Sequence, residues 1–138
     1  MDYVLDRGCF EPVKAHDTDA GYDLRTPTTQ FIAAHSSIVI DTGVHFNIPK
    51  GHYGKLESKS GLNVKHSIVS LGGVIDSGYT GSVKVKLYNM GGQAYVFAAG
   101  DKIVQIVFMR CDSPALKKVD EFEEETERGS SGFGSSGK

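Results

Sequence analysis

Apolar and polar residues alternate with a period of two along most of the chain. The clearest example is residues 82–88, where polar or amphipathic side chains separate Val83, Val85 and Leu87. This period is typical of a strand with one buried and one exposed face. By this criterion, strands are predicted at 3–5, 31–33, 38–40, 44–48, 53–57, 67–71, 82–88, 94–97 and 103–110.

Helical spacing of apolar residues is absent from every stretch of about 12 residues. A single helical turn is predicted at 60–66, with Ser60 as its N-cap. Many short strands separated by glycine-containing turns indicate an all-β fold, a distorted jelly roll or barrel. The length of 138 residues suits one compact domain.

The C-terminal end has a different composition. Residues 120–127 are acidic, and residues 128–138 include four glycines and four serines. Because such a segment cannot build a core, we expect a β-domain at 1–127 followed by a flexible arm at 128–138. Composition alone would make this arm a linker. Phe133 between two glycines, with Arg128 upstream, favours instead a segment that closes over a ligand.

Composition and charge narrow the function classes. Glycine makes up 17 of 138 residues, about 12% against a typical share of about 7%, which implies turns or backbone that approaches a ligand closely. The net charge of −2 argues against a nucleic-acid partner. The lack of a long apolar run and of a signal peptide predicts a cytoplasmic protein without membrane contact. Cys9 and Cys111 are then expected to be reduced thiols.

Lys59, Ser60 and Gly61 stand where a strand ends and the helical turn begins. A helix start presents unpaired N–H groups that stabilise an anion, and the lysine and serine add a charge and a hydroxyl. The alternative is an ordinary N-cap beside a solvated lysine.

The segment 73–81 has the pattern of a β-hairpin whose tip carries Asp76 and Tyr79. Asp76 follows apolar residues, so its carboxylate can be held rigidly and accept a proton from water. Tyr79 offers a flat face to a sugar or base. A turn aspartate bonded to its own backbone, beside a structural tyrosine, explains the pattern equally well.

Two further polar residues are candidates for phosphate or metal binding. Asp23 lies in a turn-like segment whose carboxylates suit a hydrated divalent cation, and Gln105 on a predicted strand can reach a phosphate oxygen. The alternatives are a tight turn entering a strand and a surface glutamine. The five histidines show no spacing typical of a zinc site.

The order of these motifs is more specific than any one of them. The segments DAGYDL, KSGL, GGVIDSGYTG, GDKIVQIVF and RGSSGFGSSGK together span nearly the whole chain from residue 19. They resemble the five ordered motifs of the homotrimeric, all-β deoxyuridine triphosphatases (dUTPases). The resemblance implies hydrolysis of dUTP to dUMP and pyrophosphate by water attack at the α-phosphorus, with Mg²⁺ on the triphosphate. This reaction limits uracil in DNA and supplies dUMP for thymidylate synthesis.

The resemblance also implies residue roles. Asp76 would be the general base, Tyr79 would pack under the deoxyribose, and the backbone at Gly72 and Gly73 would read the uracil edge. Each site of the trimer would be assembled from all three chains, with the C-terminal arm exchanged between subunits. The phosphates would be held by Lys59, Ser60, Gly61 and Gln105, and Asp23 would act through the water molecules of Mg²⁺. From the arm of a neighbouring chain, Arg128 would bind the γ-phosphate and Phe133 would cover the uracil. Gly134, Ser135 and Ser136 of the same arm would lie over the phosphates.

The chain departs from the family pattern at three positions. Lys59 and Lys102 stand where arginine is usual, so a bidentate fork becomes a point charge. Gly78 stands where an acid is common. These departures motivate an alternative, a dUTP-sensing regulatory protein that binds without turnover. A dCTP deaminase-like enzyme is a further alternative, although its chemistry calls for a glutamate near the base.

Overall fold

The computed structural model describes residues 1–123 and 126–130. Within them the chain forms strands and one short helix, which confirms the all-β class and the single helical turn. The elements are β1 (Tyr3–Leu5), β2 (Tyr22–Arg25), β3 (Gln30–Ile32), β4 (Ser36–Asp41), β5 (Val44–Phe46), β6 (His52–Ser58), α1 (Ser60–His66), β7 (Ile68–Leu71), β8 (Val74–Ile75), β9 (Lys84–Asn89), β10 (Tyr95–Phe97) and β11 (Lys102–Arg110).

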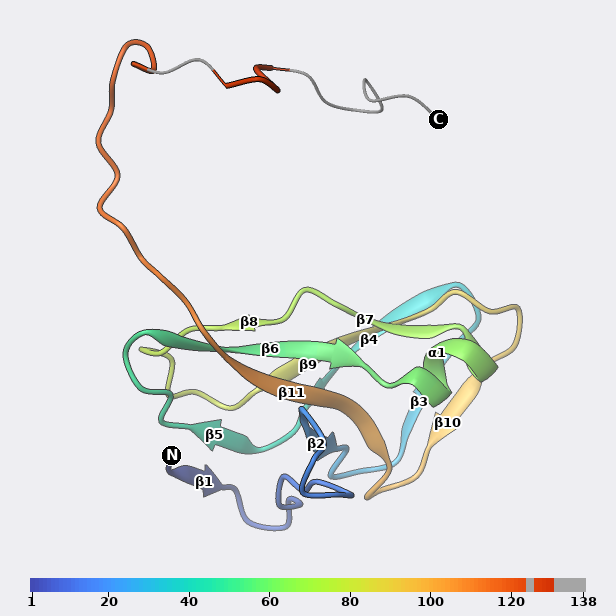
Figure 1. Ribbon diagram of the computed structural model, residues 1–138. Helices are drawn as coiled ribbons and strands as arrows, with labels where there is room; N and C mark the ends of the chain where they lie inside the picture. The colour runs from blue at the N-terminus through green and yellow to red at the C-terminus, as the bar shows by residue number, and fades with distance from the viewer. Residues whose placement is uncertain (124–125, 131–138) are drawn as a thin grey trace.

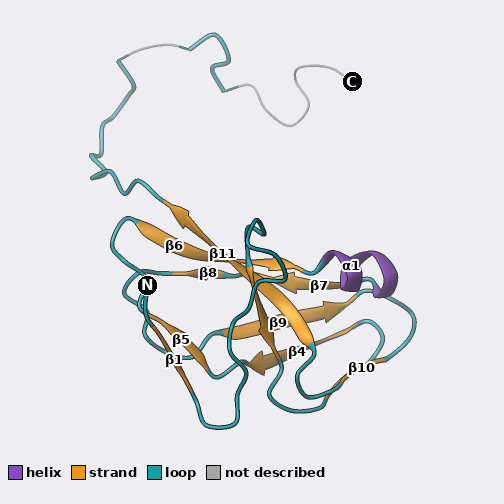
Figure 2. Ribbon diagram, turned by 60° about the horizontal axis from the view of Figure 1, so that its bottom comes forward, coloured by secondary structure: helices purple, strands orange, loops and turns teal. Residues whose placement is uncertain are grey.

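All strand pairs are antiparallel, and they form four small sheets (Figures 1 and 2). The largest has the order β2-β11-β6-β8, and a second has the order β4-β9-β7. β1 pairs with β5, and β10 pairs with β3. β11 is the longest strand, with nine residues, and it pairs with β2 on one edge and β6 on the other. Most residue contacts in the described structure join segments that are far apart in the sequence.

The core is built from the apolar positions of the alternating strands. Val83, Val85 and Leu87 are no more than 1% exposed, whereas Lys84 and Lys86 between them are exposed. The alternation at 82–88 therefore identified the buried face correctly. The other buried apolar residues are Leu24, Ile32, Ile40, Val44, Phe46, Ile48, Leu56, Ile68, Phe97, Ile103, Val104 and Ile106.

Two strands have no counterpart among the predicted ones. In β2, Asp23 and Leu24 are both buried, so the strand has no alternation to detect. β8 has only two residues, too few for any period. β8 pairs with β6, whereas β9 pairs with β4 and β7. The predicted β-hairpin at 73–81 is therefore wrong, because the strands on either side of the loop belong to different sheets.

The predicted N-cap of the helix is also wrong. The N-cap of α1 is Lys59, whose backbone is extended and whose side chain makes no capping hydrogen bond. Ser60 is already the first helical residue. At the other end, Ser67 adopts a left-handed conformation with φ of 55° and ends the helix, as αL residues commonly do.

After Arg110 the chain leaves the body of the domain (Figure 1). Residues 111–123 form neither strand nor helix, and Leu116 and Phe122 are 96% and 89% exposed. No helix in the part of the chain that the structure describes is long and apolar enough to cross a membrane.

Two glycines near Asp76 differ in what they require. Gly73 has φ of +121°, and a Cβ added there would lie 2.7 Å from the Leu56 Cβ. Gly78 has no heavy atom within 4 Å of the position that a Cβ would take.

We expect Gly73→Ala to lower the free energy of unfolding by about 1–3 kcal/mol. Gly78→Ala should instead raise it by about 0.4–1 kcal/mol, because it restricts the unfolded chain. Urea unfolding followed by circular dichroism measures both, and equal effects of the two variants would contradict this assignment.

Candidate active site

A buried carboxylate between two lysines marks the first group of polar residues. Asp23 on β2 is only 5% exposed. The Lys59 ammonium donates to one of its carboxylate oxygens, and Lys102 Nζ lies 2.7 Å from the other. The two lysine side chains are 27% and 37% exposed. The arrangement holds one negative and two positive charges, so it attracts an anion at its solvent-facing side.

The two lysines also decide the protonation of Asp23. Burial raises the pKa of this carboxyl group, but the hydrogen bonds from Lys102 and Lys59 outweigh burial and hold the pKa below its ordinary value. Asp23 is therefore ionised at neutral pH, and its charge keeps both ammonium groups in place.

The remaining members of this group lie on β11 and at the start of α1. Gln105 lies opposite Asp23 on β2 and opposite Glu57 on β6. A Cβ on Gly21 would meet the Gln105 Oε1 at 2.9 Å, so the amide of this side chain lies against the backbone just before β2. Ser60 and Gly61 follow Lys59 directly at the start of α1. We call Asp23, Lys59, Ser60, Gly61, Lys102 and Gln105 the lysine cluster.

Lys102 was not among the residues that the sequence assigned to the site. Its signal in the sequence was its place in GDKIVQIVF, where the dUTPase pattern has arginine. Only the register of β11 against β2 shows that it shares Asp23 with Lys59.

The second group of candidate residues lies on either side of β8. The Gly73 carbonyl accepts a hydrogen bond of 2.8 Å from the Leu56 N–H, which holds the start of β8 against β6. Asp76 comes directly after β8, and its carbonyl accepts from the Tyr79 N–H at 3.1 Å. The Tyr79 ring is 42% exposed, and its hydroxyl donates to the Ser82 carbonyl at 2.8 Å. We call residues 76–82 the Asp76 loop.

The two groups lie at opposite ends of β6. Because β8 pairs with β6 in the register Gly54 to Ile75, Asp76 lies beside the beginning of β6. Lys59 follows the last residue of the same strand. Six residues of extended chain separate these points, which at about 3.3 Å per residue is about 20 Å. Figure 1 shows β8 beside one part of β6 and α1 beyond the other end of that strand.

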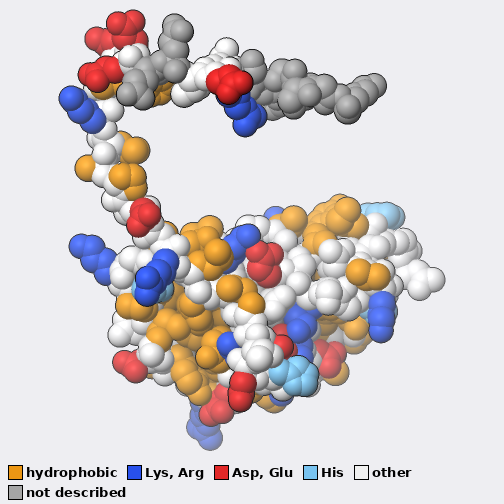
Figure 3. All heavy atoms as spheres, viewed as in Figure 1, with side chains coloured by type: hydrophobic (Ala, Val, Ile, Leu, Met, Phe, Trp, Pro, Cys, Tyr) orange, Lys and Arg blue, Asp and Glu red, His pale blue; other side chains and the backbone are white. Residues whose placement is uncertain are grey.

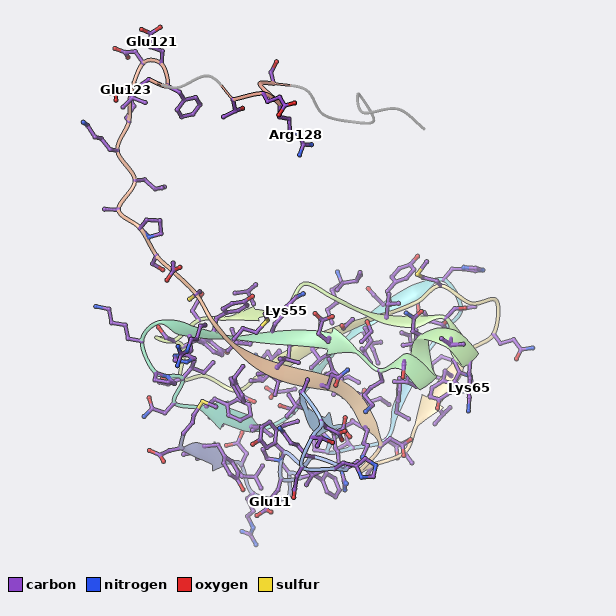
Figure 4. All side chains as sticks on the ribbon, viewed as in Figure 1. Glu11, Lys55, Lys65, Glu121, Glu123 and Arg128 are labelled. Atoms are coloured by element: carbon purple, nitrogen blue, oxygen red, sulfur yellow. The ribbon has the colours of Figure 1, made fainter. Side chains whose placement is uncertain are left out.

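The C-terminal arm is described only in part. Arg128 lies on the segment that has left the body, away from both groups (Figure 4), next to a turn in which the Gly129 N–H donates to the Thr126 carbonyl at 2.9 Å. The predicted contacts of Phe133, Gly134, Ser135 and Ser136 fall outside the described residues.

Asp23 is the acidic member of the lysine cluster and the candidate for contact with a metal ion. Within residues 1–123 and 126–130, no three His, Cys, Asp or Glu side chains form a group that could hold a metal. Both oxygens of Asp23 are engaged by lysines, but each keeps a lone pair that can accept a hydrogen bond from water. The site thus suits a hydrated metal that arrives with a phosphate ligand. Figure 3 shows acidic and basic side chains interspersed over the face it displays.

Comparison with known proteins identifies the relatives of the chain. The dUTPase family model matches residues 11–137. The mouse deoxyuridine 5'-triphosphate nucleotidohydrolase is 39% identical over 127 residues, which cover 92% of this chain and 78% of the mouse protein. The protein of the same name from Paramecium bursaria Chlorella virus 1 is 37% identical over 126 residues, 91% of this chain and 89% of the viral one.

Solved structures agree with the sequence matches. A mutant of the Staphylococcus bacteriophage 80alpha dUTPase with dUpNHpp matches with a TM-score of 0.92 and 31% identity, covering 99% of this chain and 97% of the phage chain. A mutant dUTPase from phage phi11 of S. aureus, which reveals the coordination of a structural Mg(II) ion, matches with a TM-score of 0.83 and 29% identity. That match covers 89% of this chain and 98% of the phage chain.

The ion pairs of Asp23 predict a pH-dependent contribution to stability. Because the pKa is lowered by folding, the contribution is complete above the ordinary carboxyl pKa of about 3.9 and is lost as the pH falls through the folded-state pKa. At pH 7, Asp23→Asn should lower the free energy of unfolding by about 2 kcal/mol. The difference from wild type should shrink below about pH 4, as urea unfolding at a series of pH values measures. Asp17→Asn, an exposed carboxylate, is the matched control. If the difference in the free energy of unfolding stays constant down to about pH 2, the charge of Asp23 is not what stabilises the folded protein.

Proposed function

The chain belongs to the dUTPase family, and from this premise we propose that its lysine cluster, Asp76 loop and C-terminal arm are parts of one dUTP-hydrolysing site shared between chains. The protein is a dUTP diphosphatase, as its curated relatives are named. These names favour hydrolysis over the deaminase-like and sensing-only alternatives. The roles of individual residues are the proposal.

The separation of Asp76 from Lys59 along β6 carries the proposal. A general base must lie within hydrogen-bond reach of the water that it activates, and that water attacks a phosphorus atom held by the lysine cluster. On one chain these groups are about 20 Å apart by the rise of β6. A complete site therefore needs Asp76 from one chain and the lysine cluster from another, as in a homotrimer.

The Asp76 loop would bind the nucleoside and activate water. Asp76 accepts a proton from the water that attacks the α-phosphorus. The hydroxyl of Tyr79 is engaged by the Ser82 carbonyl, so Tyr79 offers the deoxyribose its ring face and leaves no room for a 2′-hydroxyl. The Gly73 carbonyl is taken by the Leu56 N–H, which leaves the other backbone groups of Gly72 and Gly73 to read the uracil edge.

The lysine cluster would bind the triphosphate. Lys59 contributes charge, Ser60 and Gly61 contribute hydroxyl and backbone donors, and Gln105 contributes an amide N–H. Asp23 fixes the position of both ammonium groups. Because an ammonium is a point charge, orientation of the phosphates depends more on this fixed carboxylate than it would with two arginines.

Mg²⁺ would enter with the triphosphate rather than reside in the protein. When bound with the substrate, the ion would supply positive charge beside the phosphate oxygens. Asp23 would contact its water shell, since both oxygens already accept from lysines. The structure of the phage phi11 dUTPase mutant holds a structural Mg(II) ion, which shows that a protein of this family binds this metal but concerns a different kind of site.

The arm at 128–138 would close the site from a neighbouring chain. Arg128 would bind the γ-phosphate, Phe133 would cover the uracil, and Gly134, Ser135 and Ser136 would surround the phosphates. The departure of the chain from the body after Arg110 supports this exchange. The domain boundary after residue 127 and a cytoplasmic location belong to the same proposal.

Asp76→Asn tests the general base. The variant should bind dUpNHpp about as tightly as wild type, while pyrophosphate release from dUTP falls by about 10² to 10⁴. Asp17→Asn, at an exposed carboxylate to which no role is assigned, should keep full turnover. Full turnover by Asp76→Asn would remove Asp76 from its role.

A mixing experiment tests the sharing of sites. Deletion of residues 128–138 should abolish most activity while the oligomer persists, as light scattering measures. Truncated chains and Asp76→Asn chains are then unfolded, mixed in equal amounts and refolded. If the arm and Asp76 come from different chains, about half of the sites receive an intact arm and about half receive an intact Asp76. About a quarter of the sites then receive both and should regain activity. No recovery would place both groups on the same chain.

A further inference from the structure

His45 connects the Asp76 loop to the strand pair β1-β5. Its Nδ1 lies 2.9 Å from the Thr80 carbonyl oxygen, and its Nε2 lies 3.3 Å from Asp6 Oδ1. His45 is on β5 and Asp6 follows β1, which pairs with β5. The ring therefore bridges the strand pair β1-β5 and the residue that follows Tyr79.

Both partners of the His45 ring are acceptors. A neutral imidazole has one N–H donor and one unprotonated nitrogen, whereas imidazolium donates from both nitrogens. Only the protonated ring can donate to Thr80 and to Asp6 together. Loss of the proton leaves one nitrogen lone pair facing an oxygen, so the neutral ring keeps only one of its two bonds. A neutral ring with its hydrogen on Nδ1 still donates to Thr80, but its Nε2 lone pair then faces the Asp6 carboxylate, which no longer holds the ring in place.

The charges around His45 favour the same state. The bond to the Thr80 carbonyl and the contact with Asp6 raise the pKa of His45 above its ordinary value, and Asp41 adds to the effect. Lys84 Nζ lies 4.0 Å from Asp41 Oδ2 and adds a positive charge to this group. Asp2 and Tyr3 line the shallow pocket beside the ring.

The rest of the loop shows why this contact matters. Its C-terminal end is held firmly, because Ser82 donates to Asp41 and the Val83 N–H donates to the Val44 carbonyl at 2.8 Å. Its N-terminal end is held where β8 pairs with β6. The His45 contact with Thr80 acts between these anchors, one residue from Tyr79.

We propose that His45 is a positioning residue for the Asp76 loop, holding Tyr79 against the deoxyribose fully only while its ring is protonated. The inference rests on the proposed function of the loop. His45 touches neither substrate nor reacting atoms in this scheme, so its loss weakens binding more than chemistry.

Kinetics of His45→Gln against pH test the proposal. A glutamine amide is a hydrogen-bond donor that does not titrate in this range, so the KM of the variant for dUTP should lack the histidine-dependent change. The ratio of wild-type KM to variant KM should rise about fivefold between about pH 6 and pH 8.5, the effect of one hydrogen bond, while the kcat ratio stays flat. Comparing ratios cancels the titration of dUTP itself. His16→Gln, an exposed histidine, is the matched control. A flat KM ratio would overturn the proposal.

Nuclear magnetic resonance on the free protein supplies a readout that needs no activity. The Tyr79 and Gly81 amide signals should shift with the midpoint of the His45 ring, and this shift should vanish in His45→Gln. Asp6→Asn should move the midpoint to lower pH. Loop amides that ignore the His45 titration would overturn the proposal even if dUTP hydrolysis is normal. Absence of hydrolysis together with a coupled titration would instead refute the proposed function of the loop.

Discussion

The burial of the Asp23 carboxylate imposes the strongest constraint on this site. A carboxylate that is 5% exposed must be paired, or its desolvation would cost several kcal/mol. Lys59 and Lys102 supply the pairing from either side, and this requires β2, β11 and the β6–α1 junction to meet. The same contacts leave positive charge at the surface, so the arrangement that pairs the buried carboxylate also suits the phosphate binding that we propose.

The stiffness of β6 imposes the second constraint. This strand carries the lysine cluster at its end and holds the Asp76 loop beside its beginning, through β8. An extended strand in a sheet cannot shorten to bring them together. This separation is the reason why we propose that a second chain supplies one of the two groups and that the arm comes from a neighbour. The Asp76 loop is in turn held at Thr80 by His45, which links this loop to the strand pair β1-β5 outside the largest sheet.

Prediction from the sequence succeeded where information is local. The alternation at Val83, Val85 and Leu87 identified a strand and its buried face, and the helical turn at 60–66 was placed correctly. It failed where long-range pairing decides. β2 has no alternation because Asp23 and Leu24 are both buried, and the loop at 73–81 is not a hairpin because β8 and β9 join different sheets. Lys102 could not be assigned to the site, since its contact with Asp23 depends on the register of β11.

The sequence by itself determined the fold class, the family and the identity of most candidate residues, because periodicity and motif order are properties of the chain alone. Tertiary structure decided how those residues are grouped: Asp23 with two lysines, Asp76 at the opposite end of β6, and His45 against Thr80. The reason is physical. Strand pairing and charge burial join residues that are distant in sequence, and no local pattern encodes which strand pairs with which or in what register.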